Sequence, residues 1–193
     1  MPLILPKPGE YEMEEKKSVF HGYCAPVQTD ADVKNVMEQI RQRFPDAGHH
    51  AFAYSLKTSN TIRFNDGGEP GGTAGMPILN VFQKTGVIDF ICVVTRYFGG
   101  IHLGAGGLVR AYGRTAKGAM LAAEPEEQVF YKAYRVVCDY PQLDIVKYNF
   151  GKLGLEAPDW QYTHECTAIL RVREDLVPMF LEGNNYRYER IEE

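Results

Sequence analysis

Residues 87–95 read VIDFICVVT, a nearly unbroken run of apolar and β-branched side chains. Because apolar residues occupy both alternating sets of positions, the run predicts a strand buried on both faces of a sheet. A glycine-rich stretch follows at residues 96–107, and helical spacing then continues to about Ala123. A strand of this kind needs cover on both sides, which predicts an α/β sandwich for this part of the chain.

The elements around this strand are predicted from periodicity, helix caps and turn residues. In chain order we expect a loose extended arm, a strand, a helix stopped by Pro45, a hairpin, and a helix that contains Pro77 and ends at Gly86. Their expected ranges are residues 1–15, 18–25, 29–44, 51–64 and 77–86.

Charge and glycine are unevenly distributed along the 193 residues. Residues 1–120 carry 13 Lys and Arg against 11 Asp and Glu, whereas the remainder carries 8 against 14. Of the 19 glycines, 12 lie between Gly67 and Gly113. The charge changes sign near residues 122–127, AAEPEE, which also have the composition of a linker. We therefore predict two domains, residues 1–124 and 125–193.

The second half of the chain has the order strand, helix, strand, helix, strand. The strands are expected at residues 129–138, 162–173 and 186–188, with helices after Pro141 and after Asp175. This order predicts a small α+β sandwich of ferredoxin-like type, so the fold class is α+β with two α/β-sandwich domains. Because this half is acidic, we expect it to supply no basic surface of its own.

Composition restricts the class of protein. Hydrophobic residues make up 45% of the chain, and no apolar run approaches the roughly 18 residues that a membrane helix needs. The opening residues, MPLILPKP, lack the pattern of a signal peptide. The four cysteines are too widely spaced for a zinc site, so we expect reduced thiols, no membrane partner and a cytoplasmic protein: Cys24, Cys92, Cys138 and Cys166.

Two glycine-rich stretches each stand directly before a predicted helix. Residues 65–77 read NDGGEPGGTAGMP, and residues 95–113 read TRYFGGIHLGAGGLVRAYG. Backbone N–H groups left uncovered by glycine, together with a helix N-terminus, can hold an anion. Tight turns and close packing of helix on sheet explain the glycines equally well. Neither stretch is a P-loop, because the G-K-[ST] ending is absent.

The second stretch adds positive charge. Arg110, Arg114 and Lys117 are spaced by four and three residues, so they share one helix face, and Arg96 is expected to reach the same neighbourhood. A solvated helix face is the plain alternative, but Asp89 is the only acid between residues 87 and 123, which favours phosphate contact. We predict a nucleic-acid- or anion-binding site made by these four cations and five glycines: Gly99, Gly100, Gly104, Gly106 and Gly107.

The first stretch contains two acids, Asp66 and Glu69. Paired acids are typical of hydrolases and magnesium sites, but acids that form turns or cap helices look the same in a sequence. We interpret both as structural, holding the loop before the Pro77 helix together with Gly72, Thr73 and Gly75. No catalytic residue, metal or cofactor is predicted.

Both stretches resemble the signature of the IMPACT family, in its bacterial two-domain, YigZ-like branch. The family pattern DGEP-S-GTAG-[RK]-PIL is matched over residues 66–79 except at three positions, and VVTRYFGG-x-x-LG-x-GGLVRAY is matched almost throughout residues 93–112. Gly67 stands where the family usually has a second Asp, Gly71 where it has Ser, and Met76 where it has Arg or Lys. The missing cation weakens anion binding by the first loop, and the missing acid weakens a metal site there.

The resemblance implies an N-terminal domain related to domain IV of elongation factor G and a ferredoxin-like C-terminal domain similar to its domain V. Those relatives act on ribosomal RNA, and eukaryotic members of the family act in translational control through protein contacts. We therefore expect a non-enzymatic, RNA- or ribosome-associated accessory protein in translation or stress regulation. A regulatory module that binds a protein partner, and a metal-dependent phosphate-ester enzyme, are the alternatives.

Overall fold

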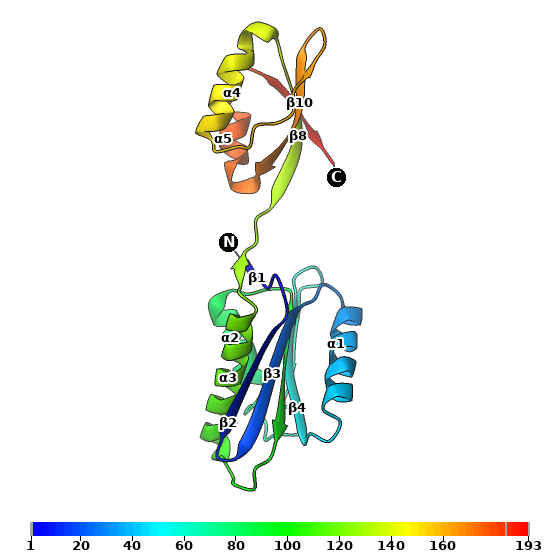
Figure 1. Cartoon of the computed structure of the whole chain (residues 1–193), viewed down its shortest axis with the longest axis vertical. Coiled ribbons are helices and arrows are strands. Elements are labelled where there is room, and N and C mark those ends of the chain that lie inside the picture. The colour runs from blue at the N-terminus through cyan, green and yellow to red at the C-terminus, as the bar shows by residue number, and fades with distance from the viewer. Residues whose placement is uncertain (1, 184, 193) are drawn as a thin grey trace. The chain divides into compact units, whose positions relative to one another are not determined.

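The computed structural model describes residues 2–183 and 185–192, and the chain divides into two compact units (Figure 1). The first unit runs from Met1 to Gln128 and the second from Val129 to Glu193. Each unit has its own hydrophobic core. Among the described residues, no helix is long and apolar enough to cross a bilayer.

The boundary falls after residue 128, whereas the sequence predicts it after residue 124. β1 (Leu3–Ile4) pairs with β7 (Glu126–Glu127), and the Gln128 N–H donates to the Pro2 carbonyl at 2.9 Å. This short ladder ties the segment after helix α3 (Gly104–Ala122) to the start of the chain. The acidic segment that resembles a linker is therefore partly built into the first unit.

The first unit contains a five-stranded antiparallel sheet with the strand order β2-β3-β6-β4-β5. Its strands are β2 (Gly9–Glu15), β3 (Ser18–Pro26), β4 (His49–Leu56), β5 (Thr61–Asn65) and β6 (Phe90–Tyr97). Its helices are α1 (Asp30–Arg43), α2 (Gly75–Thr85) and α3 (Gly104–Ala122).

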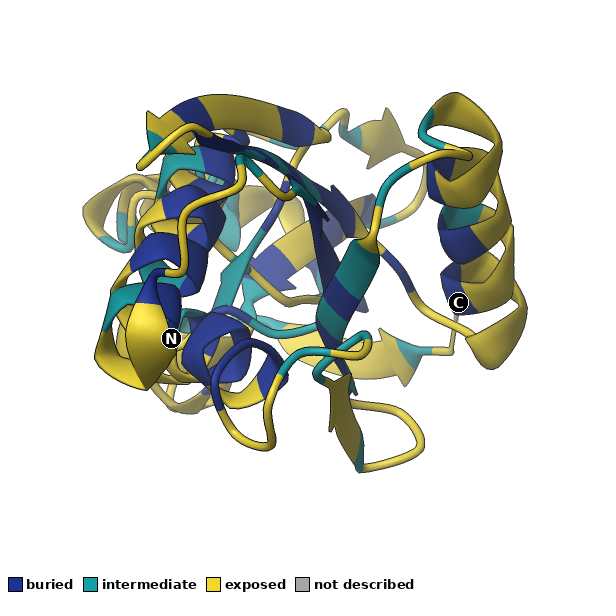
Figure 2. Cartoon of the chain, turned by 90° about the horizontal axis from the view of Figure 1, so that it is seen from below, coloured by how far each residue is buried: buried dark blue, intermediate teal, exposed yellow. Residues whose placement is uncertain are grey.

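The central strand, β6, is buried on both faces, as its sequence predicts. Phe90, Cys92 and Val94 pack in the core that includes residues of α2 and α3. Ile91 and Val93 pack in the second core of this unit, which includes residues of α1. The two cores lie on opposite faces of the sheet, so α1 covers one face while α2 and α3 cover the other (Figure 1). Figure 2 shows the helices buried on one side and exposed on the other.

Residues 9–15 form strand β2 and not the loose arm that the sequence predicts. Lys16 and Lys17 have φ values of 48° and 62°, so they make the two-residue turn that joins β2 to β3. Outward glutamates at alternate positions give the segment a charged composition that concealed the strand, while Met13 on the other side is buried. β2 is therefore an edge strand whose inner side supports α3.

The helix ends follow the caps in the sequence, with one difference. α1 begins after Thr29, whose Oγ1 accepts from the Asp32 N–H at 3.2 Å while the Asp32 carboxylate accepts from the Thr29 N–H. α2 ends at Gly86 in the left-handed conformation, φ 76°. α3 begins at Gly104, so the glycines at 104–107 form its first turn and not a loop before it.

The second unit has the connectivity β-α-β-β-α-β and one four-stranded antiparallel sheet with the order β11-β8-β10-β9. Its elements are β8 (Tyr131–Cys138), α4 (Leu143–Lys152), β9 (Gln161–Tyr162), β10 (Cys166–Arg173), α5 (Val177–Leu181) and β11 (Arg187–Ile191), with short 3₁₀ turns at Tyr140–Gln142 and Glu174–Leu176. The sequence predicts one strand over residues 162–173, but the chain reverses at residues 163–165 and forms two paired strands, β9 and β10.

The four cysteines are free thiols that lie in two cross-strand pairs. Cys24 is opposite Cys92 on β3 and β6, and Cys138 is opposite Cys166 on β8 and β10. All four are buried. Burial raises the pKa of Cys24 to about 12 and the pKa of Cys92 well above its usual value, so both thiols stay protonated at neutral pH.

The ladder between β1 and β7 predicts where the first unit can be separated. A fragment of residues 1–128 should fold by itself. A fragment of residues 1–124 should melt at a lower temperature, because it lacks backbone hydrogen bonds that contribute about 1 kcal/mol each. Thermal unfolding followed by circular dichroism compares the two fragments. Equal melting temperatures would contradict a structural role for β7, and insolubility of both fragments would contradict this boundary.

Candidate functional site

A buried ion pair joins the two glycine-rich stretches. Nη1 of Arg96, on β6, donates to Oε1 of Glu69, in the loop before α2, at 2.7 Å, and the two side chains are only 6% and 4% exposed. Tyr112 of α3 donates its hydroxyl to the same Oε1 at 2.8 Å. Nη2 of Arg96 donates to Oγ of Ser18 on β3 at 3.2 Å. We call these four residues the Arg96 cluster.

Arg96 is buried within this cluster, whereas the sequence predicts that it joins Arg110, Arg114 and Lys117 in a binding face. A charge removed from water needs a partner with good geometry, and Glu69 provides that partner. Burial, followed by the bond to Glu69, raises the pKa of Tyr112, so its hydroxyl remains a donor. Because Glu69 stands 27 residues before Arg96 in the chain, sequence spacing does not reveal the pair.

Asp66 caps α2 from outside the helix. Its carboxylate accepts three backbone N–H bonds, from Gly72 at 2.9 Å, Ala74 at 3.0 Å and Gly75 at 2.9 Å. Burial raises the pKa of Asp66, but these three bonds outweigh burial, so the pKa lies below its usual value. The Thr73 hydroxyl closes the same loop by donating to the Pro70 carbonyl at 2.6 Å.

Both acids of the first loop therefore form hydrogen bonds within the first unit. The sequence predicts a structural role for both. Within residues 2–183 and 185–192, no group of three or more His, Cys, Asp or Glu could hold a metal ion. Gly67 has a φ of 61°, and a Cβ there would lie 2.4 Å from the His50 carbonyl, so this backbone has no room for the family's second Asp. Met76 is 37% exposed and brings no charge to the loop.

Asp66→Asn tests the cap. The amide keeps the shape of the side chain but removes the charge, so we expect the free energy of unfolding at pH 7 to fall by about 1 kcal/mol. Since the folded-state pKa is lowered, the stabilisation is present above the unfolded-state value of about 3.9 and is lost as the pH falls through the folded-state value. The difference between parent and variant in urea unfolding should shrink from pH 7 to pH 3. A constant difference would contradict the cap.

Glu69→Gln and Tyr112→Phe test the Arg96 cluster. The first leaves a buried guanidinium without its counter-charge and should lower the free energy of unfolding by about 3–5 kcal/mol. The second removes one bond to a charged acceptor and should cost about 2 kcal/mol. Glu38→Gln, on the exposed side of α1, serves as a control and should change stability by less than about 0.5 kcal/mol. A larger destabilisation by Tyr112→Phe than by Glu69→Gln would contradict the ion pair.

The N-terminus of α3 is open. The N-cap residue, Leu103, makes no side-chain hydrogen bond to the first turn, and the turn contains no acidic residue. Arg110 folds back over this turn, because its Nη1 lies 3.6 Å from the place that a Cβ at Gly106 would occupy. Gly104 has a φ of 68° and no neighbour near its Cβ position. The first turn thus presents backbone N–H donors and one guanidinium at the positive end of the helix dipole.

Arg110, Arg114 and Lys117 are exposed along α3, as their spacing predicts. Arg114 lies 3.6 Å from Glu15 of β2, and these two side chains are 65% and 39% exposed, so the pair is a weak surface contact. We call these three cations, with the first turn of α3, the α3 site.

The loop before α3 does not contribute as the sequence predicts. Gly99 packs against the β2–β3 turn, where a Cβ would lie 2.0 Å from the Lys17 carbonyl, and its N–H already donates to Ser18 Oγ at 3.2 Å. Gly100 makes a turn with a φ of 81°. The structure instead brings Lys16 and Lys17, both exposed, to this loop. In the sequence, the adjacent lysines at the end of β2 are the feature that could have indicated this positive charge.

In the second unit, for which the sequence predicts no basic surface, several arginines share one face of the sheet together with acidic residues. The strand register places Arg135 of β8, Arg171 of β10 and Arg187 of β11 on one face of the sheet, where Ile169, opposite Arg135, is 63% exposed. Glu189 lies opposite Arg135, and Arg187 pairs with Glu165. Net charge summed over half a chain does not show how cations are sorted between the two faces of a sheet.

Comparison with known proteins gives matches that extend through both units. The Impact N-terminal domain family matches residues 16–120. An IMPACT family member of Haemophilus influenzae is 35% identical over 173 residues, which are 88% of this chain and 84% of that protein. The IMPACT family member YigZ of Escherichia coli is 36% identical with the same coverage. A crystal structure of a hypothetical protein, 30% identical in sequence, matches with a TM-score of 0.63. The match covers 99% of this chain and 97% of the chain in that crystal structure.

Proposed function

Because this chain belongs to the IMPACT family, in the branch that includes bacterial YigZ, we propose that it is a non-enzymatic cytoplasmic accessory protein of translation that contacts RNA or the ribosome. The observation that carries this proposal is the open first turn of α3 beneath Arg110. The role in translation is what the IMPACT resemblance implies. The structure supports the proposal through the exposed surface of α3.

The α3 site has the chemistry that a phosphate backbone requires. A helix N-terminus stabilises an anion by about 0.3–1 kcal/mol, and Arg110 adds a charge-assisted bond to the same anion. Arg114 and Lys117 extend the positive surface along the helix. The exposed contact between Arg114 and Glu15 is weak enough for a phosphate to replace it. Such contacts read the backbone and not the base sequence, which suits ribosomal or structured RNA.

We extend the proposal to the two folds. The first unit is proposed to resemble domain IV of elongation factor G, and the β-α-β-β-α-β connectivity of the second supports a ferredoxin-like domain comparable to domain V. A likeness of fold raises the expectation of RNA contact without supplying the activity.

A protein-binding module is the second candidate function, and one observation favours it. Phe98 and Ile101, in the loop before α3, are 50% and 43% exposed, and Val109 on α3 is 41% exposed. Exposed apolar side chains beside a basic helix are typical of protein interfaces. The phosphate-ester enzyme is not favoured, because Asp66 and Glu69 are both held within the first unit.

Arg110→Glu with Arg114→Glu tests the α3 site. Both side chains are exposed, so the fold should be retained, while affinity for ribosomes or for a structured RNA should fall. The slope of log affinity against log salt should flatten by about 0.9 for each phosphate that the variant no longer neutralises. Filter binding over a range of salt concentrations, with circular dichroism as the check on folding, measures both effects.

Arg110→Glu and Lys84→Glu form a matched pair of single variants. Lys84 is an exposed cation in the last turn of α2, so both variants make the same change in net charge. Only Arg110→Glu should weaken RNA binding. Equal weakening by both would show a general effect of net charge, and a parent protein that binds no RNA at 50 mM salt would give first place to the protein-binding module.

A further inference from the structure

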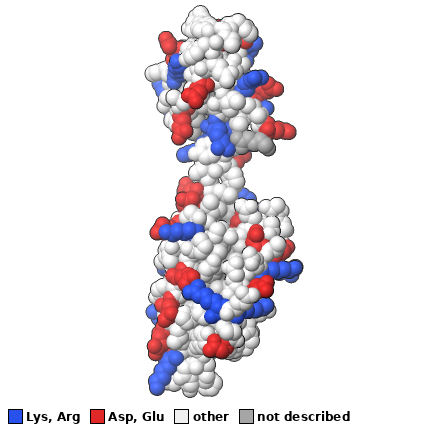
Figure 3. All heavy atoms as spheres, turned by 45° about the vertical axis from the view of Figure 1, so that its right-hand side comes forward, with Lys and Arg blue, Asp and Glu red and all other residues white. Residues whose placement is uncertain are grey.

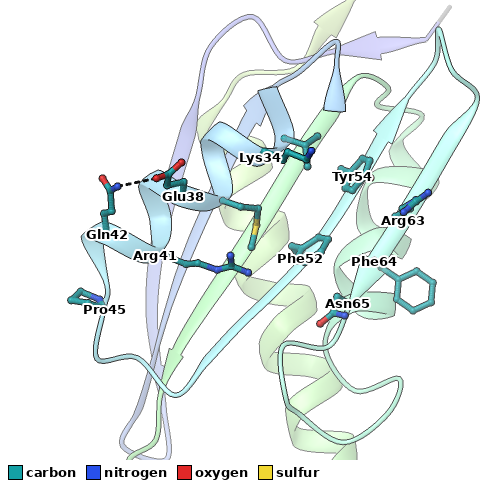
Figure 4. Close-up of a pocket in the computed structure, with 12 residues that line it drawn as sticks. Lys34, Glu38, Arg41, Gln42, Pro45, Phe52, Tyr54, Arg63, Phe64 and Asn65 are labelled. Atoms are coloured by element: carbon teal, nitrogen blue, oxygen red, sulfur yellow. Dashed lines mark hydrogen bonds between the residues drawn. The ribbon is translucent and has the colours of Figure 1, made fainter. Parts of the chain in front are cut away.

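A second positively charged surface lies on the opposite face of the sheet from α3. α1 packs over β3, β6 and β4, and the sheet continues past it to the edge strand β5. The space between α1 and the β4–β5 hairpin is an open groove of about 910 Å³, which we call the α1 groove. Figure 4 shows its lining side chains. No part of the α3 site reaches this face.

The floor of the α1 groove is aromatic. Phe52 and Tyr54 are two residues apart on β4, so both point to the α1 side, and their ring centroids are 6.3 Å apart with an interplanar angle of 19°. Phe52 is half-buried and presents its ring to the groove, whereas Tyr54 is buried and donates its hydroxyl to Asp30 at 3.3 Å. The floor is therefore a flat platform with one accessible ring.

The walls of the α1 groove are basic. Lys34 and Arg41 stand on α1, and Arg63 stands on β5 across the groove; all three are exposed. In Figure 4, Arg41 extends from the helix toward the Phe52 ring. Within the described part of the chain, none of the three forms an ion pair. Figure 3 brings this side of the first unit forward and shows Lys and Arg across it, with Asp and Glu among them.

The one acid in the lining, Glu38, offsets little of this charge. Its Oε1 accepts from Nε2 of Gln42, one turn further along α1, at 3.4 Å. Three cations against one acid is a local excess in a chain whose net charge is -4. This excess favours an anionic occupant, and the Phe52 ring offers a surface on which a flat ring can stack.

From this geometry we propose that the α1 groove binds a short single-stranded segment of nucleic acid, with an unpaired base stacked on Phe52 and phosphates held by Arg41, Arg63 and Lys34. Base-on-aromatic stacking beside a basic track is the chemistry by which proteins hold unpaired strands. The volume of the groove lies within the range of about 300–1,000 Å³ that is typical of small-molecule sites. This inference deepens and rests on the proposed function, because it names unpaired RNA as the ligand of a second surface.

Fluorescence anisotropy with a labelled eight-nucleotide oligouridylate and with a 16-base-pair RNA duplex tests the α1 groove on the full chain. Phe52→Leu should weaken oligouridylate binding at least about fivefold and leave duplex binding unchanged, because stacking contributes about 1 kcal/mol or more per base. Phe52→Tyr keeps the ring and should bind as the parent does. Equal binding by Phe52→Leu and the parent would overturn the inference.

Arg41→Gln and Arg63→Gln keep the test decisive even if Phe52→Leu does not fold, since both side chains are exposed. Each should flatten the salt slope for oligouridylate by about 0.7, the value per phosphate for single strands. Lys84→Gln, which removes the same charge from α2, should leave the slope unchanged. An eight-residue oligoglutamate should not displace the oligonucleotide; displacement at equal concentration would overturn the inference in favour of an acidic peptide.

The α3 double variant separates this inference from the proposed function. If Arg110→Glu with Arg114→Glu weakens duplex binding while Phe52→Leu still weakens oligouridylate binding, both surfaces act. If the α3 variant weakens binding and every groove variant binds as the parent does, the α1 groove inference is wrong and the proposed function stands. If only the groove variants weaken RNA binding, the proposed role of the α3 site is wrong.

Discussion

The burial of Arg96 is the constraint on which the rest of the first unit depends. A guanidinium that ends the central strand inside the unit must find a carboxylate, and the carboxylate comes from a loop that precedes a different helix. Glu69 then also accepts the Tyr112 hydroxyl, which fixes α3 to the same point. One ion pair thus sets the positions of β6, the glycine-rich loop and α3 relative to one another.

This arrangement explains why the two glycine-rich stretches occur together. In the first, the loop must bend sharply enough for Asp66 to reach three N–H groups of its own turn and for Glu69 to reach Arg96. In the second, the chain must leave β6 past Ser18 and enter α3 within a few residues, so Gly99 packs directly on backbone. Both acids of the first stretch are therefore bonded inside the first unit, and so is Arg96, one of the four cations predicted to bind an anion. The other three cations remain on the outside of α3 without a full set of partners.

The sequence predicts most of the local structure and little of the pairing between distant residues. The β6 strand, the Thr29 cap, the Gly86 end and the exposure of Arg110, Arg114 and Lys117 follow from residue order within a few positions. The Arg96–Glu69 pair does not, because no periodicity links residues from different elements.

Local sequence patterns were also misleading where charged residues obscured the arrangement of a strand or a sheet. The glutamates of β2 gave an edge strand the composition of a loop, and the acidic total of the second half hid three arginines that share one face of its sheet. The α1 groove was missed for a related reason. The sequence predicts a hairpin that contains Phe52 and Tyr54, and only the strand order reveals that the sheet extends past α1 at that point.

The positions of the α3 site and the α1 groove restrict the kind of RNA that could satisfy both proposals. α3 packs on the β2–β3 side of one sheet face, whereas the α1 groove opens at the β4–β5 side of the other. A helix and a sheet layer, each about 10 Å thick, separate them. A straight duplex cannot touch both faces, and a single strand would have to pass around a sheet edge to do so. An RNA that engages both surfaces must therefore be folded, with helical phosphates for the open end of α3 and an unpaired segment for Phe52. Ribosomal RNA, in which helices and unpaired segments lie close together, has this form, whereas an extended message does not.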